Sequence, residues 1–127
     1  MAQFLSAEHM TAATDAMAAD GGFQNAITGK QLGLQFVVTE RPAGDIHYHL
    51  SVGDGAATMA LGELEGADAS ITSTYETAAA LYRGEENVQM AFMTGKIKVG
   101  GNMATIMMNQ SLINEFTRIQ GDLDLDV

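Results

Sequence analysis

The sequence predicts an α/β (α+β) fold, in which a mixed sheet of about five strands is covered on one face by helices. Three observations indicate this fold class. Short runs of alternating apolar and polar residues, separated by turn signals, follow one another between residues 33 and 73. Helical patterns lie on both sides of this block. One more alternating run, at 96–100, lies between two of the later helical segments.

The first expected element is a helix over about residues 6–19. Ser6 has the side-chain oxygen that commonly caps a helix N-terminus. The run DGG at 20–22 is expected to end the helix, because a glycine pair disfavours its continuation. Between these signals, the apolar residues at helical spacing are Met10, Ala13 and Met17.

Three strands are expected next, each separated from the following one by a turn. In LQFVVTE (34–40), alternate residues point to opposite faces of a sheet. RPAGD (41–45) contains the only proline and predicts a turn before the second strand at 46–52. GDG (53–55) predicts the next turn, which leads into a strand that begins at Ala56. Such runs are typical of antiparallel strands with one buried face.

A fourth strand is expected at 69–73, followed by a helix. Ser73 and Glu76 have the spacing of a capping box, which opens a helix, and Gly84 is placed to end it. Because helices occupy the connection to the run at 96–100, that run could lie parallel to the strand at 69–73. Parallel and antiparallel pairs together would make the sheet mixed.

The remaining elements are a short helix, the strand at 96–100 and a last helix. Asn87 is the expected cap of the short helix, which ends at Gly95. The last helix is expected to run from Asn102 to about Gln120. The acidic tail that follows, GDLDLDV, is expected to be frayed. The apolar stripe of the last helix consists of Met108, Leu112, Phe116 and Ile119.

Length and composition favour a single domain over residues 1–127. Hydrophobic residues make up 46% of the chain, enough for a packed core. There is no cysteine, so disulfides and thiolate chemistry are excluded. The first residues lack the features of a signal peptide, and no run reaches the length of a transmembrane helix. We therefore expect a cytoplasmic protein without stable membrane insertion.

The charge balance disfavours nucleic acid as a partner. Acidic residues outnumber basic ones 16 to 6, which gives a formal net charge of -10. Such a chain repels phosphate backbones at long range, and its basic residues are scattered apart from Lys96 and Lys98. We expect no binding of nucleic acid, whereas formation of a homodimer is left open by the sequence.

The segment GKIKVGGNMATIMMN (95–109) joins a half-buried strand to a helix start rich in methionine. Five of the nine methionines fall between residues 90 and 108. Methionine is flexible and is common on surfaces that adapt to more than one partner. One interpretation is an apolar cavity between helices and sheet that holds a lipid-like ligand. The other is a core filled by methionine, as in a structural or interaction module, and the pattern alone leaves both open.

Residues 71–109 contain the end of a strand, a helix that ends in glycine, a short helix, and then GKIKVGGN before an apolar helix. This arrangement resembles the sterol carrier protein family (type two, nonspecific lipid transfer). The resemblance is close over 68–119 and looser, but compatible in order, over 1–67. The tryptophan often found in the family's early strands is absent. The matching residues are Asp68, Ile71, Thr72, Gly84, Ala91, Phe92, Gly95 to Val99, Gly101, Asn102 and Met103.

The resemblance implies a five-stranded sheet covered on one face by helices. It also implies a tunnel between the two layers that takes up a sterol, a fatty acid or a fatty acyl-CoA. We therefore expect a noncatalytic lipid carrier that needs no cofactor. Its expected ligand-binding residues are Phe36, Leu50, Leu81, Met90, Phe92, Met103, Ile106, Met107 and Phe116.

Two other binding sites receive less support from the sequence. His47 and His49 share a strand face, as a metal-binding pair would, but no obvious third ligand accompanies them, so no metal is expected. Backbone N–H groups at Gly101 and Asn102 could hold a carboxylate or phosphate, although Asn102 more simply caps a helix.

The alternative function is a small enzyme, or an enzyme subunit, that holds an apolar substrate in the same cavity. No nucleophile motif and no pair of carboxylates supports a catalytic site. The candidate proton carriers for such an enzyme are Tyr48, Tyr75, Tyr82 and His47.

Overall fold

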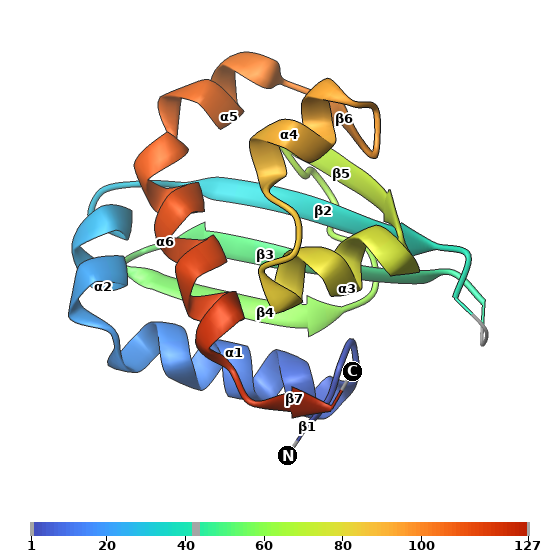
Figure 1. Ribbon diagram of the computed structural model, residues 1–127. Helices are drawn as coiled ribbons and strands as arrows, with labels where there is room; N and C mark the ends of the chain where they lie inside the picture. The colour runs from blue at the N-terminus through green and yellow to red at the C-terminus, as the bar shows by residue number, and fades with distance from the viewer. Residues whose placement is uncertain (1, 42–43, 127) are drawn as a thin grey trace.

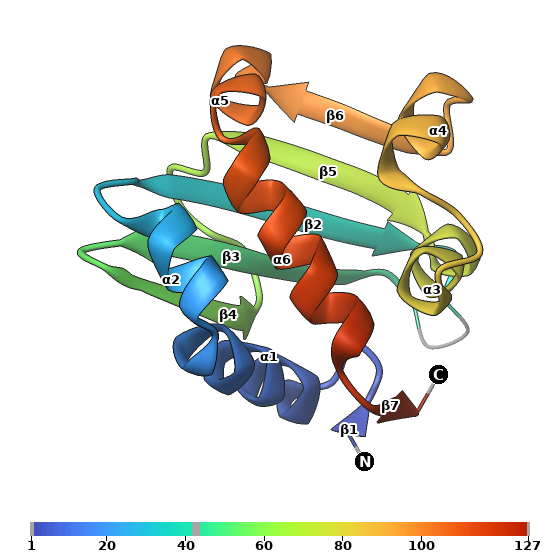
Figure 2. The same cartoon turned by 60° about the vertical axis from the view of Figure 1, so that its left-hand side comes forward.

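A five-stranded mixed sheet forms the centre of the protein, and helices cover one of its faces (Figure 1, Figure 2). The computed structural model describes residues 2–41 and 44–126; the turn predicted at 41–45 falls partly on residues 42 and 43, outside these ranges. The strands of the sheet are β2 (Leu32–Thr39), β3 (Ile46–Gly53), β4 (Ala56–Leu61), β5 (Ala69–Thr74) and β6 (Ile97–Gly101). The helices are α1 (Ala7–Ala19), α2 (Gly21–Ile27), α3 (Tyr75–Arg83), α4 (Val88–Met93), α5 (Met103–Met108) and α6 (Gln110–Asp122). The predicted fold class is confirmed.

The strands lie in the order β4-β3-β2-β5-β6. β2 is antiparallel to β3 and parallel to β5, whereas β5 is antiparallel to β6. The sheet is mixed, as predicted, but the prediction that 69–73 and 96–100 lie parallel is wrong. α3 and α4 stay at the end of the sheet where β5 finishes (Figure 2). β6 therefore starts there, with Ile97 opposite Ser73, and runs back along β5.

Asp68 holds the start of β5 against its neighbours. Its backbone N–H donates to the Gly33 carbonyl oxygen over 2.8 Å, and its carboxylate accepts from the Gly33 N–H over 2.8 Å. The Asp68 carbonyl oxygen accepts from the Asn102 N–H over 2.9 Å. One residue thus ties β2 to β5 and to the start of α5, and it fixes the parallel register that begins with Leu34 opposite Ala69.

The capping signals in the sequence are largely confirmed. Ser6 caps α1 and Asn87 caps α4, each side chain accepting a backbone N–H from three residues further on. Gly84 ends α3 in the left-handed conformation, which glycine adopts without strain. The cap of α3 is Thr74 and not Ser73, because β5 continues in extended conformation through Thr74.

One helix was missed by the sequence analysis. α1 ends at Ala19, as the DGG run predicts. The Asp20 carboxylate, however, accepts from the Phe23 N–H over 2.9 Å and so opens α2 directly afterwards. A strong N-cap thus outweighs the two glycines that follow it, at Gly21 and Gly22.

The predicted last helix is divided in two at Asn109, where the chain leaves the helical conformation between α5 and α6. The Asn109 side-chain amide donates to the Thr105 carbonyl oxygen over 2.8 Å at the end of α5. Met108 therefore belongs to a different helix from the rest of the predicted stripe and is 77% exposed, so its place in that stripe is wrong. The buried members of the stripe are Leu112, Phe116 and Ile119.

The C-terminal tail is ordered by pairing, so the prediction of a frayed tail is wrong. β7 (Leu125–Asp126) pairs in parallel with β1 (Ala2–Gln3), and Leu125 is buried. The Tyr82 hydroxyl donates to the Leu123 carbonyl oxygen and accepts from the Leu125 N–H over 2.9 Å. The strand pair β1–β7 is thereby tied to Tyr82 of α3.

We expect Gly101→Ala to destabilise the protein strongly. The φ angle of Gly101 is +83°, and a Cβ there would lie 2.8 Å from the Asp68 carbonyl oxygen and 2.9 Å from the Ala69 Cα atom. The left-handed conformation costs a non-glycine residue ~1–2 kcal/mol, and forced overpacking adds ~1–3 kcal/mol.

Gly95→Ala is the matched control, because the φ angle of Gly95 is +79° while no atom lies near its Cβ position. Urea denaturation should give Gly101→Ala a free energy of unfolding at least ~1 kcal/mol below that of Gly95→Ala. Equal values for the two variants would contradict the close approach of Gly101 to Asp68.

Candidate functional site

An apolar cavity of about 140 Å³ lies between the sheet and the helices α3 and α6. Alternate residues of β2 and β5 face this cavity because side chains of a strand point in turn to opposite faces. The main sheet residues that line it are Leu34, Phe36, Val38, Tyr48, Ile71 and Ile97. The main helix residues that line it are Ala78, Leu81, Tyr82, Ile113 and Phe116. No lining residue carries an acidic or basic side chain other than His9.

Three stacked aromatic rings, two from the sheet and one from α6, line the cavity. The ring centroids of Phe36 and Tyr48 are 4.8 Å apart with an angle of 7° between the planes. The centroids of Phe36 and Phe116 are 5.8 Å apart. Burial raises the pKa of Tyr48 above its ordinary value, so its hydroxyl stays neutral at physiological pH. The stack therefore presents a wall without charge.

His9 lines the same cavity as a neutral, buried side chain. Its Nδ1 accepts from the Leu5 N–H over 2.9 Å and therefore carries no proton. Nε2 must carry the proton in the neutral ring, and it donates to the Gln120 side-chain oxygen over 2.9 Å. Burial lowers the pKa of His9, and the hydrogen bond to Gln120 opposes that effect only in part. His9 thus links the N-terminal segment to α6 without bringing charge to the cavity.

The structure brings together three of the nine sequence-predicted ligand-binding residues. Phe36, Leu81 and Phe116 line the cavity. Leu50 is fully buried in the main core, and Ile106 packs against that core. The other four residues lie on the surfaces of α4 and α5, and they are Met90 (51% exposed), Phe92 (46%), Met103 (40%) and Met107 (73%). Their contact with a ligand stays a prediction.

Several cavity residues were missed by sequence reasoning. Tyr48 was named only as a proton carrier of the alternative enzyme; it lies on the same strand face as Leu50, so the alternation of β3 could have identified it as a wall residue too. Ile113 is one helical turn before Phe116, so the helical spacing could have identified it as a residue of the same face. Phe4 and His9 lie far away in the sequence and offered no local signal.

At the two rival sites, His49 and Asn102 are engaged by other groups of the protein. The His49 Nδ1–H donates to the Gly62 carbonyl oxygen over 3.0 Å, and His47 Nδ1 lies 3.8 Å from a Glu63 carboxylate oxygen. Among residues 2–41 and 44–126, no three His, Asp or Glu side chains are grouped as a metal site would require. At the start of α5, the Asn102 side chain accepts from the Thr105 N–H over 3.2 Å and acts as the helix cap.

The candidate proton carriers of the alternative enzyme are not gathered at one point. Tyr48 and Tyr82 line the cavity, but the Tyr82 hydroxyl is engaged by the backbone of the C-terminal tail. The Tyr75 ring packs edge-on against Phe4 with centroids 6.0 Å apart. His47 is absent from the cavity lining.

The fold is that of a known class of domain. The chain belongs to the SCP-2 sterol transfer family, whose pattern matches residues 5–114. The family resemblance found in the sequence is therefore confirmed. In the part of the chain that the structure describes, no helix has the length and apolarity needed to cross a bilayer.

Other sterol carrier proteins are similar to this chain in sequence or in fold. Sterol carrier protein 2 from Gallus gallus is 33% identical over 78 residues, which cover 61% of this chain and 14% of that protein. The crystal structure of a sterol carrier protein 2 superposes with a TM-score of 0.81 at 18% identity, covering 96% of this chain and all of that one. The sterol carrier protein domain 2 of Helicoverpa armigera gives a TM-score of 0.68 at 25% identity, with 94% and 91% of the two chains covered.

We expect acidification to destabilise the protein through His9. The pKa of His9 is lowered in the folded state, so the unfolded state binds more protons below its own pKa of ~6.5. The contribution of neutral His9 to the free energy of unfolding is therefore complete above pH ~6.5. It is lost as the pH falls towards the folded-state pKa, and the free energy of unfolding decreases by up to ~1.4 kcal/mol per pH unit. Urea denaturation between pH 8 and pH 5 measures this loss.

His9→Gln should lose less stability than the wild type over the same pH range, because glutamine does not titrate. His49→Gln is the control, since the His49 side chain lies outside the cavity lining. A pH dependence of His9→Gln that equals those of the wild type and of His49→Gln would show that His9 does not titrate with folding.

Proposed function

We propose that this chain is a noncatalytic carrier that binds and transfers a lipid-like molecule, namely a fatty acid, a fatty acyl-CoA or a sterol. The ligand lies in the cavity between the sheet and the helices α3 and α6. Residues 1–127 act as one lipid-binding domain in this proposal, and the cytoplasmic location expected from the sequence is part of it.

The uncharged wall of the cavity is the observation that carries the proposal. A cavity lined by aliphatic and aromatic side chains favours an apolar guest over water. Burial of a chain supplies ~0.8 kcal/mol per CH₂ group, so that fourteen carbons supply ~11 kcal/mol before the costs of ordering. Micromolar binding corresponds to ~8 kcal/mol and needs no strong polar contact. Membership of the SCP-2 sterol transfer family supports the same conclusion.

The volume of the cavity requires that it enlarge around a ligand. About 140 Å³ is less than the ~300–1,000 Å³ of typical small-molecule sites. α6 can move most easily at its N-terminal end, since no side chain caps it at Asn109. Ile106 packs against the core at this same end, so a long chain would extend past Ile106 towards the rest of α5. Met103 and Met107 would contact the ligand in this enlarged state.

We expect Ala78→Phe to weaken binding of a fluorescent fatty acid by about tenfold or more, because the larger side chain fills the existing cavity. Ala104→Phe is the control, because Ala104 is an exposed helix residue outside the cavity lining. Its affinity should stay within about twofold of the wild type. Equal affinities for the two variants, with the fold retained by circular dichroism, would contradict binding in this cavity.

The predicted contact of Met107 is tested by Met107→Lys. We expect several-fold weaker binding of a long-chain fatty acid, because a charged side chain would lie beside the apolar chain. Met93→Lys is the matched control: Met93 is 78% exposed and Met107 73%, and Met93 lies on α4, away from the α5–α6 junction. Titration of both variants with the same fatty acid separates the two positions. If they bind equally well, Met107 is not part of the site.

A further inference from the structure

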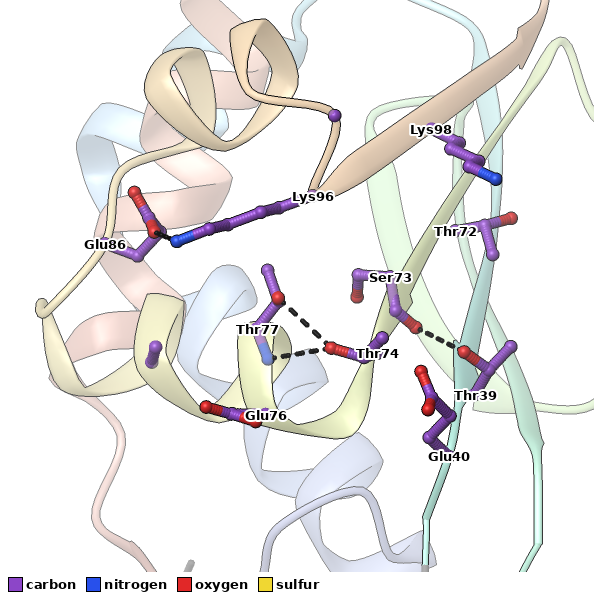
Figure 3. Close-up of a pocket in the computed structure, with 12 residues that line it drawn as sticks. Thr39, Glu40, Thr72, Ser73, Thr74, Glu76, Thr77, Glu86, Lys96 and Lys98 are labelled. Carbon is purple, nitrogen blue, oxygen red and sulfur yellow. Dashed lines mark hydrogen bonds and ion pairs between the residues drawn. The ribbon is translucent and has the colours of Figure 1, made fainter.

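A second hollow, of about 580 Å³, lies at the end of the sheet where β5 finishes and β6 begins. We call it the polar notch. It opens because the β5–β6 pairing ends with Ser73 opposite Ile97. Beyond this pair, Thr74 caps α3 while Gly95 and Lys96 arrive from α4, so no ladder joins the two segments (Figure 3).

Hydroxyl groups and charges of both signs line the polar notch. Its hydroxyl groups come from one serine and four threonines, and two of these, Thr74 and Thr77, bond to each other over 3.1 Å. Three carboxylates and two ammonium groups also line it, a formal balance of one negative charge. The charged residues are Glu40, Glu76, Glu86, Lys96 and Lys98.

The two lysines of the polar notch differ in their partners. Lys96 Nζ lies 2.8 Å from a Glu86 carboxylate oxygen, and this pair spans the side of the notch (Figure 3). Lys98 makes no ion pair with any residue in the described part of the chain. The chain has only six basic residues. Lys98, which is one of them, can therefore donate a charge-assisted hydrogen bond to an anionic group in the notch.

The polar notch adjoins the apolar cavity through Ser73, which lines both. On α3, Thr77 lines the notch and the next residue, Ala78, lines the cavity. At the start of β6, Lys98 and the preceding Lys96 line the notch while Ile97 lines the cavity, since successive strand residues alternate. A polar and an apolar compartment thus lie against each other, as an amphipathic molecule requires.

We infer that the polar notch binds the head group of a single-chain zwitterionic lipid whose acyl chain lies in the cavity. This inference rests on the proposed carrier function. Lys98 and the hydroxyl groups suit a phosphate, while Glu40 and Glu76 suit an ammonium group. A purely anionic head group would meet three carboxylates in a chain of net charge -10. The cavity volume favours one acyl chain over two.

The test compares four lipids with the same acyl chain below their micelle concentrations: lysophosphatidylcholine, lysophosphatidic acid, the fatty acid and the monoacylglycerol. Displacement of a fluorescent fatty acid measures each affinity. We expect lysophosphatidylcholine to bind about tenfold tighter than the fatty acid or the monoacylglycerol. Equal affinities of the four lipids would overturn the inference while leaving the carrier function in place. Failure of all four lipids and of a fluorescent sterol to bind would overturn the carrier function itself.

Two variants test the residues. Lys98→Gln should lower the affinity for lysophosphatidylcholine about tenfold and leave that for the monoacylglycerol within about twofold. Glu76→Gln should weaken lysophosphatidylcholine and strengthen lysophosphatidic acid, because it removes an ammonium partner and a repelling charge together. Lys30→Gln, an exposed lysine outside the notch, is the control and should change nothing. Equal changes for all four lipids in either variant would contradict the head-group contacts.

Discussion

The hydrogen bonds of Asp68 determine how the two halves of the protein combine. They join β2, at Gly33, to the start of α5, at Asn102. The parallel β2–β5 pairing that starts there continues in step to Thr39 and Thr74. Because β5 is fixed at its start, its length determines where α3 begins. The path of the chain through α3 and α4 then determines where β6 begins. Asp68 and Gly101, both matched by the family resemblance, are thus residues of close backbone contact.

The cavity and the polar notch both follow from this register. Strand residues alternate between faces and helix residues rotate by about 100° per position, so neighbours in sequence can face different surroundings. β5 and α3 meet where the sheet ends, and their residues divide between an apolar side and a polar side. The ion pair of Lys96 with Glu86 joins the residue before β6 to the α3–α4 connection, and this contact lowers the pKa of Glu86. A single junction therefore supplies two chemically opposite surfaces.

The features that the sequence predicted well are those set by short-range patterns. The strands β2 to β6 and the caps at Ser6, Asn87 and Asn102 depend on alternation and on side chains within three residues. Two features that the sequence did not predict depend on distant residues. The ordered conformation of the C-terminal tail depends on a hydrogen bond to Tyr82, and the direction of β6 depends on the path of the chain through α3 and α4. In the site, Phe36 and Phe116 follow from the buried faces of their elements. The exposure of the methionines on α5 follows from the break at Asn109, which periodicity did not reveal.

The anchoring of α6 is uneven, and this bears on how the cavity can change size. Its C-terminal half is held by Arg118, whose guanidinium lies 2.8 Å from an Asp20 carboxylate oxygen, and by Gln120 through His9. Its N-terminal end has no side-chain cap and follows the short α5. Outward movement at that end breaks fewer polar contacts than movement of the whole helix. In the proposed carrier, the flexible apolar side chains of Met103 and Met107 on α5 would cover chains of different length at little cost in strain.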